Sequence, residues 1–424
     1  LYLNVIRPAN ISGKKSLPVI FWIYGGGFAS GDSAANPGDS FVTRALANNK
    51  PVIFVSANYR LNVFGFLGGK EVQEAGLANL GLHDQQFALK WIQEHISEFG
   101  GDPRKVTIWG QSAGATSVSL HLLANEGNTE GLFVGGIMNS GSPYHLTDTA
   151  SRQQWFDFIA QEVNCASAHD RLQCLRDAPY QLLVNAVNKT PALLDYQSIN
   201  LVWRPTVDGK FIIRDPVLSI QQEKYAKIPI MTGDTEDEGT LFVLSSLNVT
   251  NSAILCTYHH SSFFPHARDS DLKLLAQKYS DNPAEGSPFN TGTDNVKSPE
   301  SKRLTAVLGD LLFQAPRRFF LRYTSRTQAT YGSVPLPGLG IYHGFDLPEF
   351  FGVGSTPDFE GTDSINSKLC SILWPKWSSS SPQLLTFVDA DPGLNITADT
   401  YRQDAMDVIN RLWLNEVFST QQAI

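Results

Sequence analysis

One serine has neighbours that could make it a nucleophile. Ser112 lies in the pentapeptide Gly-Gln-Ser-Ala-Gly of residues 110–114, after the strand-like residues 106–109 and before the helix-like residues 115–123. The two glycines remove side chains that would crowd a sharp turn at the serine. A helix beginning there points its positive end and its free N–H groups at an anion formed beside the hydroxyl. The pattern also occurs in loops by chance, but the strand before it and the helix after it favour a nucleophile.

A serine nucleophile needs hydrogen-bond donors for the oxyanion that its attack creates. Residues 24–28 (Tyr-Gly-Gly-Gly-Phe) end an apolar, strand-like stretch. We predict that the backbone N–H groups of Gly26 and Gly27, together with that of Ala113, form a three-donor oxyanion hole. The plainer alternative is a glycine-rich turn with no ligand. A phosphate-binding loop is less favoured, because no Gly-Lys-Ser/Thr follows.

The serine also needs a base and an acid that orients this base. Among nine histidines, His343 follows Ile341-Tyr342 and precedes Gly344, so we expect it where a strand opens into a loop, although structural histidines are commoner. The acid is expected between the serine and the histidine. The strand-like residues 228–233 run into an acidic loop, which in most proteins would only be solvated. The pattern does not choose among its carboxylates, which are Asp234, Glu236, Asp237 and Glu238.

The elements that would position these residues alternate between strands and helices. Expected strands cover residues 1–6, 19–24, 52–57, 131–139, 228–233 and 339–342, and expected helices cover 41–47 and 83–98. Residues 151–222 are mostly helical in pattern, and 281–300 form a polar loop. This alternation is typical of an α/β protein in which helices cover both faces of a mostly parallel sheet.

The composition limits the classes of partner. The chain has 424 residues, 42% of them hydrophobic, and a formal charge of −8. The negative charge argues against nucleic acid as a partner. No apolar run approaches a membrane span, and no signal peptide is visible in a chain that begins at Leu1.

The cysteines and glycosylation sequons favour an extracellular protein. None of the four cysteines has metal-type spacing, so we expect no metal site. Cys165 and Cys174 flank a short polar segment that suits a local disulfide. Sequons begin at Asn10, Asn188, Asn248 and Asn395, of which the second is weakened by Pro191. Together these features favour a secreted, glycosylated protein.

Five motifs in order carry a resemblance to a known family. They are Trp-Ile-Tyr-Gly-Gly-Gly-Phe at 22–28, Asn-Tyr-Arg-Leu at 58–61, Gly-Gln-Ser-Ala-Gly at 110–114, Asp-Glu-Gly at 237–239 and His-Gly at 343–344. With them the chain resembles the type-B carboxylesterases, α/β-hydrolases that include cholinesterase-like esterases and fungal lipases. The likeness runs over nearly the whole chain and implies one domain over residues 1–424. The residues Trp-Pro-Lys-Trp at 374–377 are most similar to those of the fungal secreted members.

The resemblance implies a role for each matching residue. Ser112 becomes the nucleophile, His343 the base, and Glu238 the acid, because Glu238 takes the second place in the Asp-Glu-Gly motif. Gly26, Gly27 and Ala113 become the oxyanion donors, and Cys165 and Cys174 match a family disulfide. The resemblance also implies a substrate pocket lined by Phe28, Leu201 and Phe242. It implies a polar environment for the triad, formed by Gln111, Ser140 and Asp346. It implies no cofactor.

The chain departs from the family in three places. Gln111 stands where cholinesterases carry glutamate, so a buried charge near the site is absent. The chain begins where the family already has outer strands, a lid-bearing disulfide loop and a choline-binding tryptophan, so we expect it to be N-terminally incomplete. A helix expected before Trp374 is compressed into residues 355–373.

These observations predict a serine hydrolase that cleaves small-molecule or lipid carboxylic esters. The first alternative is a lipase that acts on long-chain acylglycerols at interfaces, although the chain shows no lid. The second is a non-catalytic adhesion or binding module on the same fold, which is disfavoured because all three triad residues are present. The sequence names neither the ester nor the oligomeric state.

Overall fold

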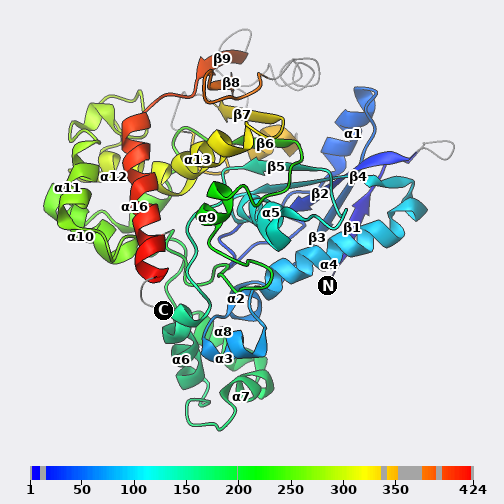
Figure 1. Ribbon diagram of the computed structural model, residues 1–424, viewed down its shortest axis with the longest axis horizontal. Helices are drawn as coiled ribbons and strands as arrows, with labels where there is room; N and C mark the ends of the chain where they lie inside the picture. Colours follow the sequence, from blue (N-terminus) through cyan, green and yellow to red (C-terminus); the bar gives the residue numbers. More distant parts are fainter. Residues whose placement is uncertain are drawn as a thin grey trace.

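The computed structural model describes residues 2–9, 16–197, 199–335, 341–351, 375–387 and 394–421. Its centre is a twisted sheet that has nine strands within these residues, in the spatial order β1-β3-β2-β4-β5-β6-β7-β8-β9 (Figure 1). The neighbours from β3 through β8 pair in parallel, and the edge strands β1 and β9 pair antiparallel. The strands are β1 Leu3–Ile6, β2 Leu17–Ile23, β3 Ile53–Ala57, β4 Gly101–Gln111, β5 Gly135–Asn139, β6 Ile230–Gly233, β7 Thr330–Pro335, β8 Gln383–Phe387 and β9 Leu394–Ala398.

Helices cover both faces of this sheet because its central strands are apolar on both sides. In β2, Val19, Phe21 and Ile23 join the main core, which includes buried residues of α4 and α5, whereas Trp22 packs on the opposite face. There Trp22 meets Trp109 and Phe351, and α1 contacts α14. Such two-sided burial is what a parallel sheet requires.

The helices form two further groups beside the sheet. In Figure 1, α10, α11, α12 and α16 lie together on one side, and α6, α7 and α8 lie together below the sheet near α3. The first group encloses a second hydrophobic core. The helix bounds are α1 Asp39–Ala47, α2 Asn62–Phe66, α3 Lys70–Ala75, α4 Leu80–His95, α5 Ala113–Leu123, α6 Gln153–Glu162, α7 Arg171–Asp177, α8 Tyr180–Val187, α9 Pro216–Gln221, α10 Ser252–Ser262, α11 Asp269–Gln277, α12 Ser301–Gly309, α13 Ala315–Thr324, α14 Leu347–Phe351 and α16 Gln403–Gln421.

The strand expected at residues 339–342 does not form in its described half, residues 341–342. Ile341 is not in a strand, and Tyr342 makes only a single parallel bridge, with Asp237. Residues 339–340 lie outside the described residues, as do Asn10, Cys370 and the segment 355–373. The sheet strand in this region is β7, which the sequence did not indicate. Most of the remaining expected elements form with bounds shifted by a few residues, although 131–134 are not part of β5.

The register of the central strands brings the candidate residues to one edge of the sheet. Ile23 is paired with Gly110, Gln111 is paired with Asn139, and Asn139 is paired with Gly233. The loops that leave these strands are therefore neighbours. They hold the glycine stretch, Ser112 and the acidic loop, at the carboxyl ends where ligands bind to open parallel sheets.

Candidate active site

Ser112 lies in a strained turn between β4 and α5. Its backbone has φ 56° and ψ −124°, and its N–H donates to the carbonyl oxygen of Asn139 over 2.8 Å. A Cβ on Gly114 would come within 2.0 Å of the Ile23 carbonyl oxygen, and one on Gly110 within 2.4 Å of Gly114. Only glycine fits at these two positions, which explains why the turn requires the Gly-x-Ser-x-Gly pattern.

The structure brings Ser112, His343 and Glu238 together. Nε2 of His343 lies 2.7 Å from Oγ of Ser112, and Nδ1 of His343 lies 2.5 Å from Oε2 of Glu238. The other carboxylate oxygen of Glu238 accepts a hydrogen bond from the N–H of Thr235 over 2.7 Å. The Glu238 side chain is fully buried and that of His343 is 10% exposed. This is the chain of contacts by which a carboxylate orients an imidazole toward a hydroxyl.

The four carboxylates of the acidic loop have four different environments. Asp234 accepts from Arg317 Nε over 2.7 Å, whereas Asp237 accepts from Ser287 Oγ and from the N–H groups of Phe289 and Ile341. Burial raises the pKa of Glu236 to about 7, and its Oε2 has no hydrogen-bond partner among the described residues. Only Glu238 of the four contacts His343 in the described structure, a distinction that the sequence pattern alone did not make.

Asp237 also holds the histidine segment in place. Its N–H donates to the Ile341 carbonyl oxygen, and its carboxylate accepts from the Ile341 N–H over 3.1 Å. Burial raises the pKa of this carboxylate, while the hydrogen bonds from Ser287, Phe289 and Ile341 lower it. Because Asp237 precedes Glu238 and Ile341 lies two residues before His343, these bonds fix the acid loop against the histidine loop.

The glycine stretch lies beside the serine. A Cβ on Gly25 would come within 2.9 Å of Ser112 Cβ, so the chain passes directly over the nucleophile. Gly26 and Gly27 have φ of 107° and 63°, which other residues rarely adopt. Neither N–H donates a hydrogen bond within the described residues. Ala113 is the first residue of α5, where helical N–H groups have no internal partner.

Apolar side chains surround the imidazole and the glycines. The rings of Phe242 and Phe313 lie 5.3 and 4.7 Å from the His343 ring. A Cβ on Gly27 would meet Leu193 at 3.2 Å and Leu201 at 3.4 Å. Of the three expected pocket residues, Phe242 and Leu201 therefore lie near the site. The third, Phe28, is 1% exposed, and its ring packs on Phe66 at 4.9 Å.

Sequence reasoning missed Phe313 and Leu193. Phe313 lies in a π-helical segment, Asp310–Gln314, between α12 and α13. Pro316 follows this segment, and a proline inside a helix removes a backbone donor, which is a common cause of such irregularity. That proline was the one available signal.

Comparisons with known proteins identify the family of this chain. The family model described as the carboxylesterase family matches residues 1–377. The chain belongs to the carboxylesterase family. It is 39% identical to Lipase 2 of Diutina rugosa over 96% of this chain and 78% of that protein. It is also 39% identical to Secreted lipase 1 of Botryotinia fuckeliana, over 96% of this chain and 75% of that protein.

The fold of this carboxylesterase is similar to that of a solved fungal protein. The crystal structure of Aspergillus niger EstA matches with a TM-score of 0.82 and 24% identity, over 98% of this chain and 84% of that one. The fold is therefore the α/β-hydrolase fold, as the sequence predicted. Membership of the family makes the chain a carboxylic ester hydrolase.

The polar residues expected around the triad lie close to it. Gln111 is buried, and its Nε2 lies 3.3 Å from Nε2 of His343. Ser140 is buried, and its N–H donates to the Gly233 carbonyl oxygen over 2.6 Å. Asp346 accepts from Nδ2 of Asn139 over 2.7 Å. Burial raises the pKa of Asp346 to about 6 although this hydrogen bond lowers it.

The described residues include the expected disulfide and three of the four sequons. Cys165 and Cys174 form a disulfide, as expected. The side chains of Asn188, Asn248 and Asn395 are exposed. Among the described residues, no helix has both the length and the apolar character needed to span a bilayer.

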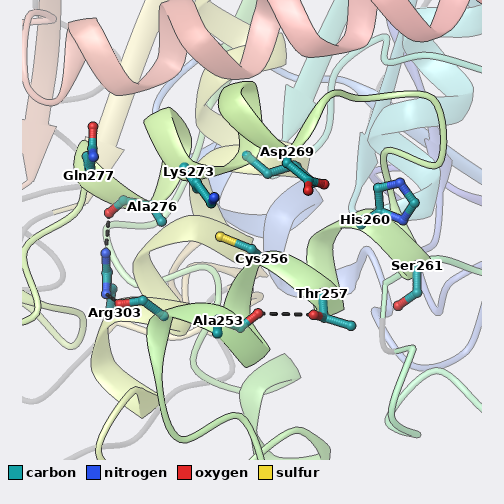
Figure 2. Close-up of a pocket in the computed structure, with 12 residues that line it drawn as sticks. Ala253, Cys256, Thr257, His260, Ser261, Asp269, Lys273, Ala276, Gln277 and Arg303 are labelled. Carbon is teal, nitrogen blue, oxygen red and sulfur yellow. Dashed lines mark hydrogen bonds between the residues drawn. The ribbon is translucent and has the colours of Figure 1, made fainter.

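A separate cavity of about 660 Å³ lies between α10 and α11 (Figure 2). Figure 2 shows Cys256 and Lys273 on its walls, and Arg303 of α12 also lines it. No triad residue lines this cavity. In the described part of the chain, no three His, Cys, Asp or Glu side chains form a group that could hold a metal ion.

Proposed function

We propose that this carboxylesterase hydrolyses carboxylic esters through an acyl-enzyme formed on Ser112. His343 removes the proton from Oγ as it attacks the ester carbonyl, and Glu238 holds the imidazole tautomer and stabilises the imidazolium. The N–H groups of Gly26, Gly27 and Ala113 bind the oxyanion of the tetrahedral intermediate. The observation that carries the proposal is the 2.7 Å distance between His343 Nε2 and Ser112 Oγ, with Glu238 behind the imidazole.

The second half of the cycle uses the same groups. The imidazolium returns its proton to the leaving alcohol as the tetrahedral intermediate collapses. Water then enters, gives a proton to His343, and attacks the acyl carbonyl, and Ser112 leaves with that proton. No metal or organic cofactor takes part in this sequence. We infer that one α/β-hydrolase domain does this work, because strands from both halves of the chain share one sheet.

An organophosphate tests this proposal directly. We expect diisopropyl fluorophosphate to label Ser112 in the wild type, and Ser112→Ala to escape labelling while its hydrolysis of a soluble ester falls on the order of 10⁴-fold or more. Folded wild-type protein that neither reacts nor hydrolyses esters would contradict the proposal. That result would favour the non-catalytic binding module.

Action on long-chain acylglycerols at an oil–water interface is the second candidate, supported by apolar side chains beside the triad. Leu244 and Tyr342 are 48% and 44% exposed, two residues from Phe242 and one from His343 respectively. Ser246 Oγ donates to the Tyr196 carbonyl oxygen, which brings the 43%-exposed Tyr196 to the same region. Exposed apolar residues that gather around a site suit contact with lipid. The relatives named above carry the name lipase.

Short-chain and long-chain esters, assayed above and below their solubility limits, distinguish the two substrate classes. A jump in rate when the substrate forms droplets would identify a lipase, and a rate that saturates below the solubility limit would identify an esterase.

We also propose that the protein is secreted and glycosylated, because a relative is named as secreted and the described sequons are exposed.

A further inference from the structure

Asn139 occupies a central place among the strands that carry the triad. It is the last residue of β5, paired with Gln111 of β4 on one side and with Gly233 of β6 on the other. Its carbonyl oxygen accepts the N–H of Ser112 over 2.8 Å and so holds the strained turn of the nucleophile. Through its backbone, Asn139 therefore already connects the serine turn with the start of the acid loop.

The side chain of Asn139 extends these connections to the histidine loop. Its amide is buried, with Oδ1 accepting from Trp109 Nε1 over 2.9 Å and Nδ2 donating to Asp346 Oδ2 over 2.7 Å. The indole N–H can only donate, so it selects the orientation of the amide that presents N–H to Asp346. Trp109 lies three residues before Ser112, and Asp346 lies three residues after His343.

The segment between His343 and Asp346 is short and internally bonded. The Phe345 N–H donates to the Tyr342 carbonyl oxygen, and the Leu347 N–H donates to the Gly344 carbonyl oxygen. α14 begins directly afterwards, at Leu347. Because these turns leave little freedom between residues 342 and 347, fixing the Asp346 side chain also fixes the position of the imidazole.

Among the side chains of the described residues, only Asn139 donates a hydrogen bond to the Asp346 carboxylate. Asp346 is 9% exposed, and its Oδ1 has no hydrogen-bond partner among the described residues. A buried carboxylate with one strong donor depends on that donor, because a lost bond in the interior is not replaced by water. An apolar side chain at position 139 would satisfy the packing of the strand but would leave Asp346 without this donor.

We propose that Asn139 is a positioning residue for ester hydrolysis, and that its amide sets the approach of the His343 imidazole to Ser112 by holding Asp346. The inference rests on the catalytic roles proposed above for these two residues. Asn139 does not touch the reacting atoms. It acts through the serine turn on one side and through Asp346 on the other.

A swap of the two polar groups tests the contact. Asn139→Asp places two carboxylates against each other, and we expect kcat to fall about tenfold at pH 8 while KM stays within about twofold. At pH 5 the two carboxyl groups share a proton, the contact re-forms, and the loss shrinks to about threefold. The double variant Asn139→Asp with Asp346→Asn restores one carboxylate facing one amide. We expect its kcat at pH 8 to recover to within about threefold of the wild type.

Two further variants separate positioning from stability. Thr149→Val removes the buried hydrogen bond between Thr149 and Thr206, and we expect it to lower Tm without changing kcat. Asn139→Ser removes the amide donor without adding a charge, so we expect kcat to fall at pH 8, where the Asp346 carboxyl group, with a pKa of about 6, is ionised. Asn139→Ser replaces Asn139→Asp if that variant does not fold.

Several results would overturn the inference. They are an unchanged kcat in Asn139→Asp or Asn139→Ser at both pH values, a double variant no better than Asn139→Asp, or an equal loss of kcat in Thr149→Val at the same Tm. A failure of the proposed function would look different, because the wild type itself would then be inactive. In that case Tm is measured for the wild type, Asn139→Asp, Asp346→Asn and the double variant. A double variant that is no more stable than the sum of the two single effects predicts would overturn the contact.

Discussion

Nε2 of His343 lies 2.7 Å from Oγ of Ser112, although 231 residues separate the two in the sequence. Two neighbouring side chains contact the imidazole of this pair. Glu238 accepts from Nδ1 on the far side of the imidazole, and Gln111 places its amide 3.3 Å from the same Nε2 that faces the serine. The imidazole therefore has a negative charge on one side and a neutral dipole on the other.

We expect Gln111→Glu to move the acid limb of the pH profile of kcat/KM to higher pH by about one unit. A carboxylate beside Nε2 stabilises the imidazolium, so the neutral form that serves as base appears only at a higher pH. Gln111→Met, which keeps the length of the side chain without charge, is the matched control and should leave the limb in place. Equal profiles for the two variants would show that the charge is not felt at His343.

The two glycines beside the serine should differ in their tolerance of alanine. A Cβ at Gly26 would meet the Ser30 carbonyl oxygen at 2.1 Å, whereas one at Gly27 would meet methyl groups of Leu193 and Leu201 at 3.2–3.4 Å. The backbone carbonyl of Ser30 cannot move aside as easily as a leucine side chain can. We therefore expect Gly26→Ala to lower kcat by about 10²–10³-fold. We expect Gly27→Ala to lower kcat by about tenfold, because the φ of 63° at position 27 is strained for alanine.

Steady-state kinetics on a soluble ester, with thermal melts of both variants, would measure this difference. A Gly27→Ala enzyme that is more impaired than Gly26→Ala, at comparable Tm, would place the oxyanion donors elsewhere.

The sequence predicted those parts of the site whose geometry is local. The turn at Ser112 and the glycine stretch each occupy a few consecutive residues whose backbone demands glycine, and the structure has them where the pattern indicated. The choice of Glu238 among four carboxylates came only from the family resemblance. It depends on which side chain meets a histidine 105 residues away, and hydrophobic periodicity contains no such information.

The missed elements depend on long-range pairing. β7, Thr330–Pro335, contains both glycine and proline and is indicated as a strand only by its neighbours β6 and β8. Residues 341–342 looked like a strand because they are apolar, but Asp237 supplies a single bridge there instead of a ladder. Phe313 reaches the imidazole from a π-helical segment that no periodic pattern predicts.

Asp399 connects the end of the sheet to the helix behind the acid loop, and we expect its loss to be severe. Its fully buried carboxylate accepts from Arg317, Arg318 and Trp377. These arginines hold its pKa below the ordinary value although burial opposes them. Asp399→Asn leaves the buried Arg318 guanidinium without its counter-charge and leaves Arg317 with Asp234 alone, so we expect the free energy of unfolding to fall by about 3–5 kcal/mol.

Urea unfolding measures the effect of Asp399→Asn. The control is Asp407→Asn, which removes the half-exposed partner of Arg322 between α13 and α16. That surface pair should contribute less than about 1 kcal/mol. Similar losses in the two variants would mean that the buried network adds nothing beyond an ordinary surface ion pair.

Glu236 should make the folded state less stable as the pH rises. Burial raises its pKa from 4.5 to about 7, with the negative charge of Asp237 adding to the effect. Between these two pH values the folded protein holds a proton that the unfolded chain has released, so the free energy of unfolding decreases with increasing pH. Glu236→Gln cannot ionise, and its Tm relative to the wild type should therefore be higher at pH 8 than at pH 5.

Glu74→Gln on the exposed surface of α3 is the control, and we expect its Tm to differ from that of the wild type by the same small amount at both pH values. Melting curves of the three proteins decide the matter: a Glu236→Gln advantage that does not grow with pH would mean that this carboxyl group is already ionised, and adequately solvated, in the folded enzyme.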